Sequence, residues 1–233
     1  MRIVSIVGIR KSGKTSTVTA LIEAIRARGQ SVGTCKTVFC PSFSIDKPGS
    51  NTMRHHQAGS GLVASRARHE TALLYPEALP LSRLLKAYEG FDYVLLEGDY
   101  LAPVSRIVCA HNADDALPRM NDLTIAFAGR ISEKGEIPLP LPRFNALDKD
   151  GVNELLDWMD QNIADVSPNP DLDKLLPHVP GVTGDDFCQC GCHEHMRQAE
   201  KDRVQVTIDG TSLELTPEQR KLLFSWAEEK NHG

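Results

Sequence analysis

Short apolar runs and helical periods alternate along the first two thirds of the chain. A run rich in β-branched residues predicts a strand at residues 2–7. Further strands are predicted at 31–36, 61–66, 91–96, 104–110 and 123–128. Apolar residues at helical spacing predict helices directly after residue 15 and at 148–163. A short helix is also expected at 51–58. This alternation predicts an α/β fold, in which a mainly parallel sheet carries helices on both faces.

The first predicted strand leads into a loop that matches the phosphate-binding pattern G-x-x-x-x-G-K-[ST] letter for letter. Gly8 and Gly13 permit backbone conformations in which amides surround phosphate oxygens, and the following helix adds its positive dipole end. Lys14 is expected to reach the β- and γ-phosphates, and the Thr15 hydroxyl to bind Mg²⁺. The predicted nucleotide-binding residues are Gly8, Arg10, Lys11, Ser12, Gly13, Lys14, Thr15 and Ser16. A purely structural glycine turn is the alternative, but the strand–loop–helix order favours nucleoside triphosphate binding.

An acidic group follows the buried run FDYVLL at residues 91–96. Glu97 stands at the carboxyl end of this strand, where a carboxylate suits a magnesium-bound water or a water-orienting role. A turn or helix-capping carboxylate is the alternative. The guanine-reading motif N-K-x-D is absent, because Asn145 and Lys149 are too far apart to form it. The motifs therefore leave GTP and ATP both open.

Residues 1–163 resemble the MobB family, the phosphate-loop adaptors of molybdopterin-guanine dinucleotide biosynthesis. The segments that carry the resemblance are the phosphate loop, IDKPGS at 45–50, AG at 58–59, VAS at 63–65, LLEG at 95–98, RIV at 106–108, IAFA at 125–128 and IP at 137–138. The resemblance implies a GTP-binding, weakly hydrolysing adaptor that forms a homodimer and assists a guanylyltransferase. It implies catalytic roles for Lys14, Thr15 and Glu97, and a magnesium site at Thr15, Asp46 and Glu97.

Two departures from the family pattern affect the expected cargo. The family usually has histidines after its second strand, whereas this chain keeps only Lys36 within CKTVFC at residues 35–40. The family also usually has an aromatic residue and a lysine after Glu-Gly, where Asp99 and Tyr100 stand here. Because Asp99 replaces a basic side chain by an acidic one, an anionic pterin phosphate would be less favourable nearby.

The last third of the chain differs in composition. Four prolines lie in 165–186, which predicts a linker between a domain at 1–164 and a metal-binding module at 187–196. The expected metal ligands are Cys188, Cys190, Cys192, His193 and His195. Thiolates and imidazoles suit zinc or an iron–sulfur cluster, while buried cysteines or a disulfide are the alternatives. Residues 202–230 predict a β-hairpin around Asp209-Gly210, followed by a helix that Thr216 caps and Pro217 begins.

Charge and cysteine content narrow the setting. The formal net charge of −5 argues against nucleic acid as a partner, and no apolar run reaches the roughly 18 residues of a membrane span. The chain enters its first strand without a leader pattern, so we expect a cytoplasmic protein, in which thiols stay reduced. Cys109 is expected in the core, whereas Cys35 and Cys40 have either a packing or a metal and redox role. His55 and His56 are expected to be solvated or hydrogen-bonded.

Three functions follow from these patterns. The first is a nucleotide-driven adaptor or metallochaperone for molybdenum, tungsten or a related metallocofactor, a slow GTPase or ATPase that delivers to a client metalloenzyme. The second is the conventional pterin-dinucleotide adaptor with a structural zinc site. The third is a small-molecule kinase, in which Arg66 and Arg68 would belong to a lid.

Overall fold

The computed structural model describes residues 1–40, 43–134 and 141–166, together with two strands near the C-terminus. The chain divides into two compact units, with the boundary after Cys188. The first unit contains the phosphate loop and is described almost completely. The second is described through its two strands alone.

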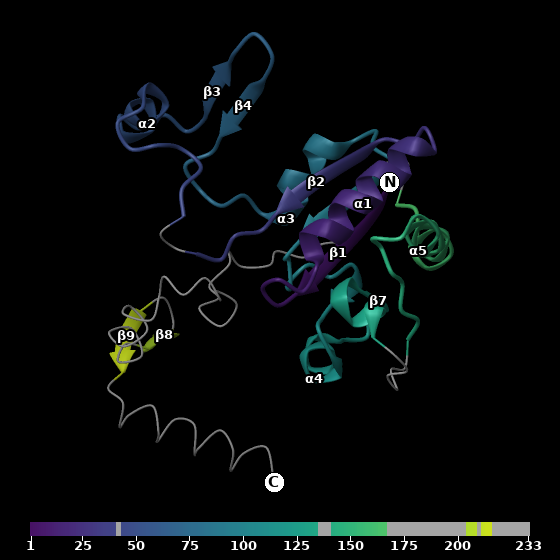
Figure 1. Cartoon of the computed structure of the whole chain (residues 1–233). Helices are drawn as coiled ribbons and strands as arrows, with labels where there is room; N and C mark the ends of the chain where they lie inside the picture. The colour runs from purple at the N-terminus through teal and green to yellow at the C-terminus, as the bar shows by residue number, and fades with distance from the viewer. Residues whose placement is uncertain (41–42, 135–140, 167–203, 209–210, 216–233) are drawn as a thin grey trace. The chain divides into compact units, whose positions relative to one another are not determined.

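The first unit is built on a five-stranded sheet in the order β2-β5-β1-β6-β7 (Figure 1). The strands are β1 (Arg2–Gly8), β2 (Val32–Lys36), β5 (Tyr93–Glu97), β6 (Ser105–Cys109) and β7 (Thr124–Ala128). Every neighbouring pair is parallel. The predicted parallel sheet is therefore confirmed. Because all five strands run in the same direction, their carboxyl ends lie along one edge of the sheet.

Helices cover both faces of the sheet, as predicted. Successive residues of β1 point to opposite faces, and both sets of apolar side chains pack against helices. Val4 and Ile6 pack with helices α1 (Lys14–Ala27) and α5 (Lys149–Asn162). Ile3 packs on the other side with Leu85 of α3 (Leu81–Leu85), which continues into η1 (Lys86–Tyr88). On that side, α4 (Ala113–Ala116), η2 (Leu117–Arg119) and η3 (Gly129–Glu133) cover the ends of β6 and β7.

The apolar run at 61–66 behaves differently from the other predicted strands. It forms β3 (Val63–Arg66), which pairs antiparallel with β4 (Thr71–Leu74) in a sheet of its own. The sequence analysis missed β4, and with it the tight turn closed by Ala67 N–H donating to Glu70 O at 2.8 Å. The preceding α2 (Asn51–Gln57) matches the predicted helix. Ser50 caps its N-terminus, because the Ser50 hydroxyl accepts a hydrogen bond from Met53 N.

The second unit contains the hairpin predicted around Asp209-Gly210. Strands β8 (Val204–Ile208) and β9 (Thr211–Leu215) pair antiparallel. The predicted linker beyond residue 166, the Cys188–His195 ligands and the helix from Thr216 lie outside the described residues. Among the helices that the structure describes, none is both long and apolar enough to cross a bilayer.

Candidate nucleotide-binding site

The loop between β1 and α1 is held in a compact form by its two glycines. Gly8 has φ 151° and Gly13 has φ 101°, and Lys11 between them is left-handed at φ 61°. A Cβ at Gly8 would lie 2.0 Å from Cys109 O, and one at Gly13 would lie 2.9 Å from the Cα of Gly129. Glycine is therefore required at both positions, by backbone conformation and by close approach of β6 and η3.

Lys14 folds back over this loop. Its Nζ donates to the carbonyl oxygens of Gly8 at 2.8 Å and Ile9 at 2.6 Å. Burial lowers the pKa of Lys14 below its ordinary value. The ammonium is thus held at the loop by two carbonyls that an incoming phosphate can replace.

The ends of β2 and β5 and the first turn of α1 bring Lys36, Glu97 and Thr15 together. In the sheet register, Glu97 lies beside Ile6 on one side and beside Lys36 on the other. Glu97 Oε1 accepts from Thr15 Oγ1 at 2.7 Å and from Lys36 Nζ at 2.9 Å. The Glu97 side chain is only 10% exposed. It therefore contacts the phosphate loop, as expected, rather than capping a helix.

Lys36 was not assigned to the site by sequence reasoning. Lys36 ends a strand that lies beside the strand of Glu97, but this order of strands is known only from the structure. In the sequence alone, a lysine at the end of a strand has no distinguishing feature.

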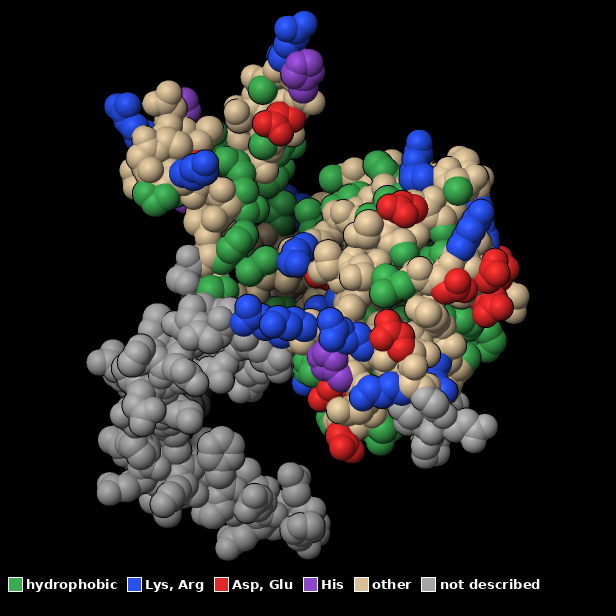
Figure 2. Space-filling view, viewed as in Figure 1, with side chains coloured by type: hydrophobic (Ala, Val, Ile, Leu, Met, Phe, Trp, Pro, Cys, Tyr) green, Lys and Arg blue, Asp and Glu red, His purple; other side chains and the backbone are tan. Residues whose placement is uncertain are grey.

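A cavity of about 740 Å³ lies against these groups. Its lining residues are Arg10, Lys11, Gly13, Lys14, Thr15, Ser16, Thr17, Lys36, Thr37, Glu97, Gly98, Gly129, Arg130, Glu133, Asn145, Ala146 and Leu147. Of the eight predicted nucleotide-binding residues, Gly8 and Ser12 do not line it, since both are buried behind the loop. Figure 2 shows Lys and Arg side chains gathered beside a histidine on the visible face of the unit.

Tyr100 holds the first glycine of the phosphate loop through two hydrogen bonds. Its hydroxyl accepts from Gly8 N at 2.9 Å and donates to Gly8 O at 2.7 Å. The buried Arg106 in turn donates from Nη2 to Tyr100 O at 2.6 Å. Sequence reasoning treated Tyr100 only as a departure from the family pattern. The structure gives it a positioning role at the first glycine of the loop.

Asp46 lies at a second cavity of about 930 Å³. Its Oδ1 accepts from Ser50 Oγ at 2.7 Å and from Lys47 N at 2.8 Å, and the Ser50 bond lowers the pKa of Asp46. The structure therefore does not bring Asp46 to Thr15 and Glu97. It gives the carboxylate a local role in the turn that precedes α2.

The other departure from the family pattern, Asp99, also lines this second cavity. Its Oδ1 accepts from Leu101 N at 3.1 Å and Ala102 N at 3.0 Å.

The three cysteines that the structure describes differ in burial. Cys109 is fully buried at the end of β6, as predicted, and Cys35 and Cys40 are partly exposed thiols. Burial raises the pKa of Cys35 to about 11. Among the described residues, no three His, Cys, Asp or Glu side chains are grouped to hold a metal ion.

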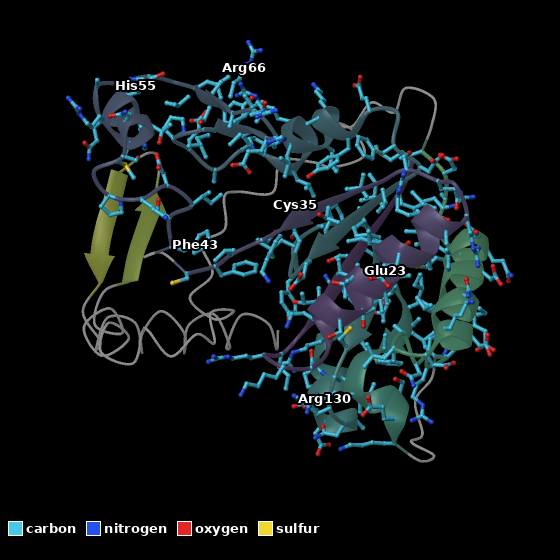
Figure 3. All side chains as sticks on the ribbon, turned by 45° about the horizontal axis from the view of Figure 1, so that its top comes forward. Glu23, Cys35, Phe43, His55, Arg66 and Arg130 are labelled. Atoms are coloured by element: carbon cyan, nitrogen blue, oxygen red, sulfur yellow. The ribbon has the colours of Figure 1, made fainter. Side chains whose placement is uncertain are left out.

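Other candidate residues lie away from the phosphate loop. Neither Arg66 nor Arg68 lines its cavity. Figure 3 shows Arg66 and Arg130 on opposite sides of the unit, so the β3–β4 hairpin does not cover the phosphate loop in this structure. His55 and His56 are exposed on α2, as expected.

Comparisons with known proteins agree with this architecture. The family model described as "MobB: Molybdopterin guanine dinucleotide synthesis protein B" matches residues 3–129. A structure of Bacillus subtilis MobB is 26% identical and has a TM-score of 0.54, covering 68% of this chain and 97% of its own. A second crystal structure of Bacillus subtilis MobB gives 25% and 0.55, covering 68% and 98%.

A Bacillus stearothermophilus MobB homologue, at 22% identity and TM-score 0.53, covers 69% of this chain and 99% of its own and shares the fold. Comparison with curated proteins gives no match. The family model spans more than half of the chain and includes β1, the phosphate loop and β5–β7. The chain therefore belongs to the MobB family.

Proposed function

We propose that this chain is a GTP-binding adaptor in molybdenum-cofactor maturation, which hydrolyses its nucleotide slowly. The observation that carries the proposal is the meeting of Lys14, Thr15 and Glu97 at one cavity. Membership of a family described by molybdopterin guanine dinucleotide synthesis supports the pathway.

Lys14 is the phosphate-binding residue of this proposal. Its ammonium would exchange the carbonyls of Gly8 and Ile9 for the β- and γ-phosphate oxygens, and the α1 N-terminus would add backbone N–H donors. The ammonium and the N–H donors would both stabilise the negative charge that develops on the phosphate oxygens during phosphoryl transfer.

Thr15 and Glu97 fit a magnesium ion, because hydroxyl and carboxylate oxygens are the ligands that Mg²⁺ prefers. The bond of 2.7 Å between them shows that both oxygens already point to one place. When bound, the ion would neutralise phosphate charge. Asp46 is left out of this shell because its carboxylate is used in the turn before α2.

The contacts of Glu97 support the proposed slow hydrolysis. A general base needs a carboxylate that is free to take a proton from water. Here Oε1 already accepts from Thr15 and from the ammonium of Lys36. Lys36 thereby restrains the carboxylate, as suits a protein whose bound nucleotide acts as a switch.

The adaptor role extends to partners. By the family resemblance, we propose a homodimer that assists a guanylyltransferase, with no nucleic acid bound. Analytical ultracentrifugation of the full chain, alone and with a purified guanylyltransferase, tests this. A monomer that does not associate with the enzyme in either nucleotide state would contradict it.

Thr15 offers a matched test of nucleotide binding. We expect Thr15→Ala to weaken the affinity for GTP about tenfold with Mg²⁺ and little with EDTA, as loss of one metal ligand predicts. Thr19→Ala, one turn along α1 and outside the cavity, is the control and should match the wild type. Calorimetric titration measures both. Equal affinities of the wild type and Thr15→Ala with Mg²⁺ would overturn the assignment.

The cysteine–histidine segment extends the proposal. Cys188, Cys190, Cys192, His193 and His195 are proposed to bind zinc or an iron–sulfur cluster, on their sequence pattern alone. Anaerobic purification with elemental analysis and a visible spectrum tests this. Colourless zinc that resists chelation favours a structural site, whereas a brown, oxygen-sensitive cluster favours delivery to a client metalloenzyme. A metal-free chain would exclude both.

A further inference from the structure

The cavity at the phosphate loop has two chemically different ends. Lys14, Thr15, Lys36 and Glu97 gather at the ends of β1, β2 and β5, where phosphates and magnesium are expected. The remaining lining comes from η3 after β7 and from the segment before α5, which supply Arg130, Glu133 and residues 145–147. This second group mixes charged, amide and apolar side chains, the combination that holds the base of a nucleotide.

The η3 turn is held firmly against the phosphate loop. Arg130 N donates to Ser12 O at 3.1 Å, and Ile131 N donates to Ala110 O at 2.7 Å. Ile131 is fully buried, and a Cβ on Gly129 would lie 2.2 Å from Ser12 O. The backbone of this turn therefore has a fixed position relative to the phosphate loop.

Arg130 and Glu133 lie three residues apart on this turn. In a 3₁₀-helix, residues at i and i+3 lie one above the other on the same face. Both side chains line the cavity and both are exposed to solvent. A planar guanidinium can stack on a base, and a carboxylate can accept hydrogen bonds at the edge of that base.

Asn145 supplies a complementary group in the lining of the same cavity. Its Oδ1 accepts from Leu147 N at 3.2 Å, which sets the orientation of the amide. The Nδ2 group is then left to donate. Phe144 N donates to Phe127 O at 3.0 Å, which ties this segment to β7 beside η3.

We propose that Glu133 and Asn145 select guanine over adenine, with Arg130 stacked on the base. Guanine presents N1–H and N2–H₂ donors, which the Glu133 carboxylate accepts, and O6 and N7 acceptors, which suit Asn145 Nδ2. Adenine presents a lone pair at N1, which a carboxylate repels. Guanine would thus be selected without the N-K-x-D motif. This inference rests on the proposed nucleotide binding at Lys14 and Thr15.

The test is a base-specificity switch in the full chain. We expect the wild type to bind Mg·GTP about 10–100-fold more tightly than Mg·ATP or Mg·XTP. Glu133→Gln replaces one acceptor oxygen by an NH₂ donor, which suits the C2 carbonyl of xanthine. In this variant the affinity for GTP should fall about tenfold or more, that for XTP should rise about tenfold, and that for ATP should change less than threefold.

Glu23→Gln is the matched control, because it removes the same charge from an exposed position on α1 outside the cavity (Figure 3). It should keep the wild-type preference, and thermal unfolding confirms that both variants are folded. Equal GTP/ATP ratios in the wild type and Glu133→Gln would overturn the base assignment and leave the phosphate site standing. A wild type that binds none of the three nucleotides would overturn the proposed function as well.

Discussion

The phosphate end and the base end of the cavity are built in different ways. The phosphate end comes mostly from one continuous segment, residues 8–15, with Glu97 and Lys36 added by the two neighbouring strands. The base end joins η3 to the segment at residues 145–147, and both lie more than 100 residues from the loop they face. The proposed phosphate binding therefore depends mainly on local sequence, whereas the proposed base selection depends on the tertiary fold.

The two ends also differ in burial. Glu97 is largely buried and bonded to two partners, and Lys14 is bonded to two carbonyls. Arg130 and Glu133 are exposed. Substitutions at the phosphate end should therefore weaken every nucleotide alike, while substitutions at the base end should change the preference between nucleotides.

The largest effect is expected for Lys14→Ala. Loss of the ammonium removes charge-assisted bonds to the phosphates, so the affinity for GTP and ATP should fall about 100-fold together. Fluorescence titration with labelled nucleotides measures the change, and Lys47→Ala, outside the cavity, is the control. A selective loss of GTP alone would contradict the division of the cavity.

Gly129→Ala tests the close contact between η3 and the phosphate loop, where the two ends of the cavity meet. The residue has φ 76°, and a Cβ would meet Ser12 O at 2.2 Å, so η3 must move away from the loop. We expect about 1–3 kcal/mol lower stability, together with weaker binding and a reduced GTP/ATP preference. Gly59→Ala also has positive φ but meets nothing within 4 Å, so it should keep the preference. Denaturant unfolding and titration test both.

Tyr100→Phe should have an intermediate effect. It removes the hydroxyl that bonds both Gly8 N and Gly8 O, at a cost of about 1–2 kcal/mol in stability. Nucleotide affinity should fall about 3–10-fold, equally for GTP and ATP, since the phosphate loop is loosened and the base end is intact. Tyr75→Phe, which is away from this cavity, serves as the control. A shifted GTP/ATP ratio would contradict the assigned role.

The smallest effect is expected for Asp46→Asn. Because Asp46 is bonded in the turn before α2 and lies at the other cavity, the Mg²⁺ dependence of GTP binding should change less than twofold. Magnesium titrations at constant GTP provide the comparison. A tenfold increase in the Mg²⁺ requirement would restore Asp46 to the magnesium shell that the family resemblance implied.

The sequence was informative where a function depends on neighbours along the chain. The phosphate loop, the helix after it and the hairpin at β8–β9 follow from local pattern and turn residues. Buried apolar runs predicted β1, β5, β6 and β7, because fully buried parallel strands are largely apolar. Glu97 was found for the same reason, as the polar residue that ends such a run. The strand β2 was also predicted, although only Gly33 of its five residues is buried.

The remaining features depend on contacts that no local pattern shows. Lys36 pairs with Glu97 because β2 lies beside β5, and Tyr100 reaches Gly8 across 92 residues of sequence. The strand β4 was missed because its residues are exposed and its run is only four residues long. Asp46 was expected near magnesium by resemblance alone, and its contacts with Ser50 and Lys47 point to a local role.

A crystal structure of the full chain with Mg²⁺ and a non-hydrolysable GTP analogue tests the central claim most directly. The account predicts that Lys14 leaves Gly8 and Ile9 for the phosphates and that Mg²⁺ is bound at Thr15. It also predicts that the base stacks on Arg130, with its N1 edge at Glu133 and its O6 and N7 atoms at Asn145. A nucleotide bound at the cavity of Asp46, with Lys14 still on the two carbonyls, would contradict it.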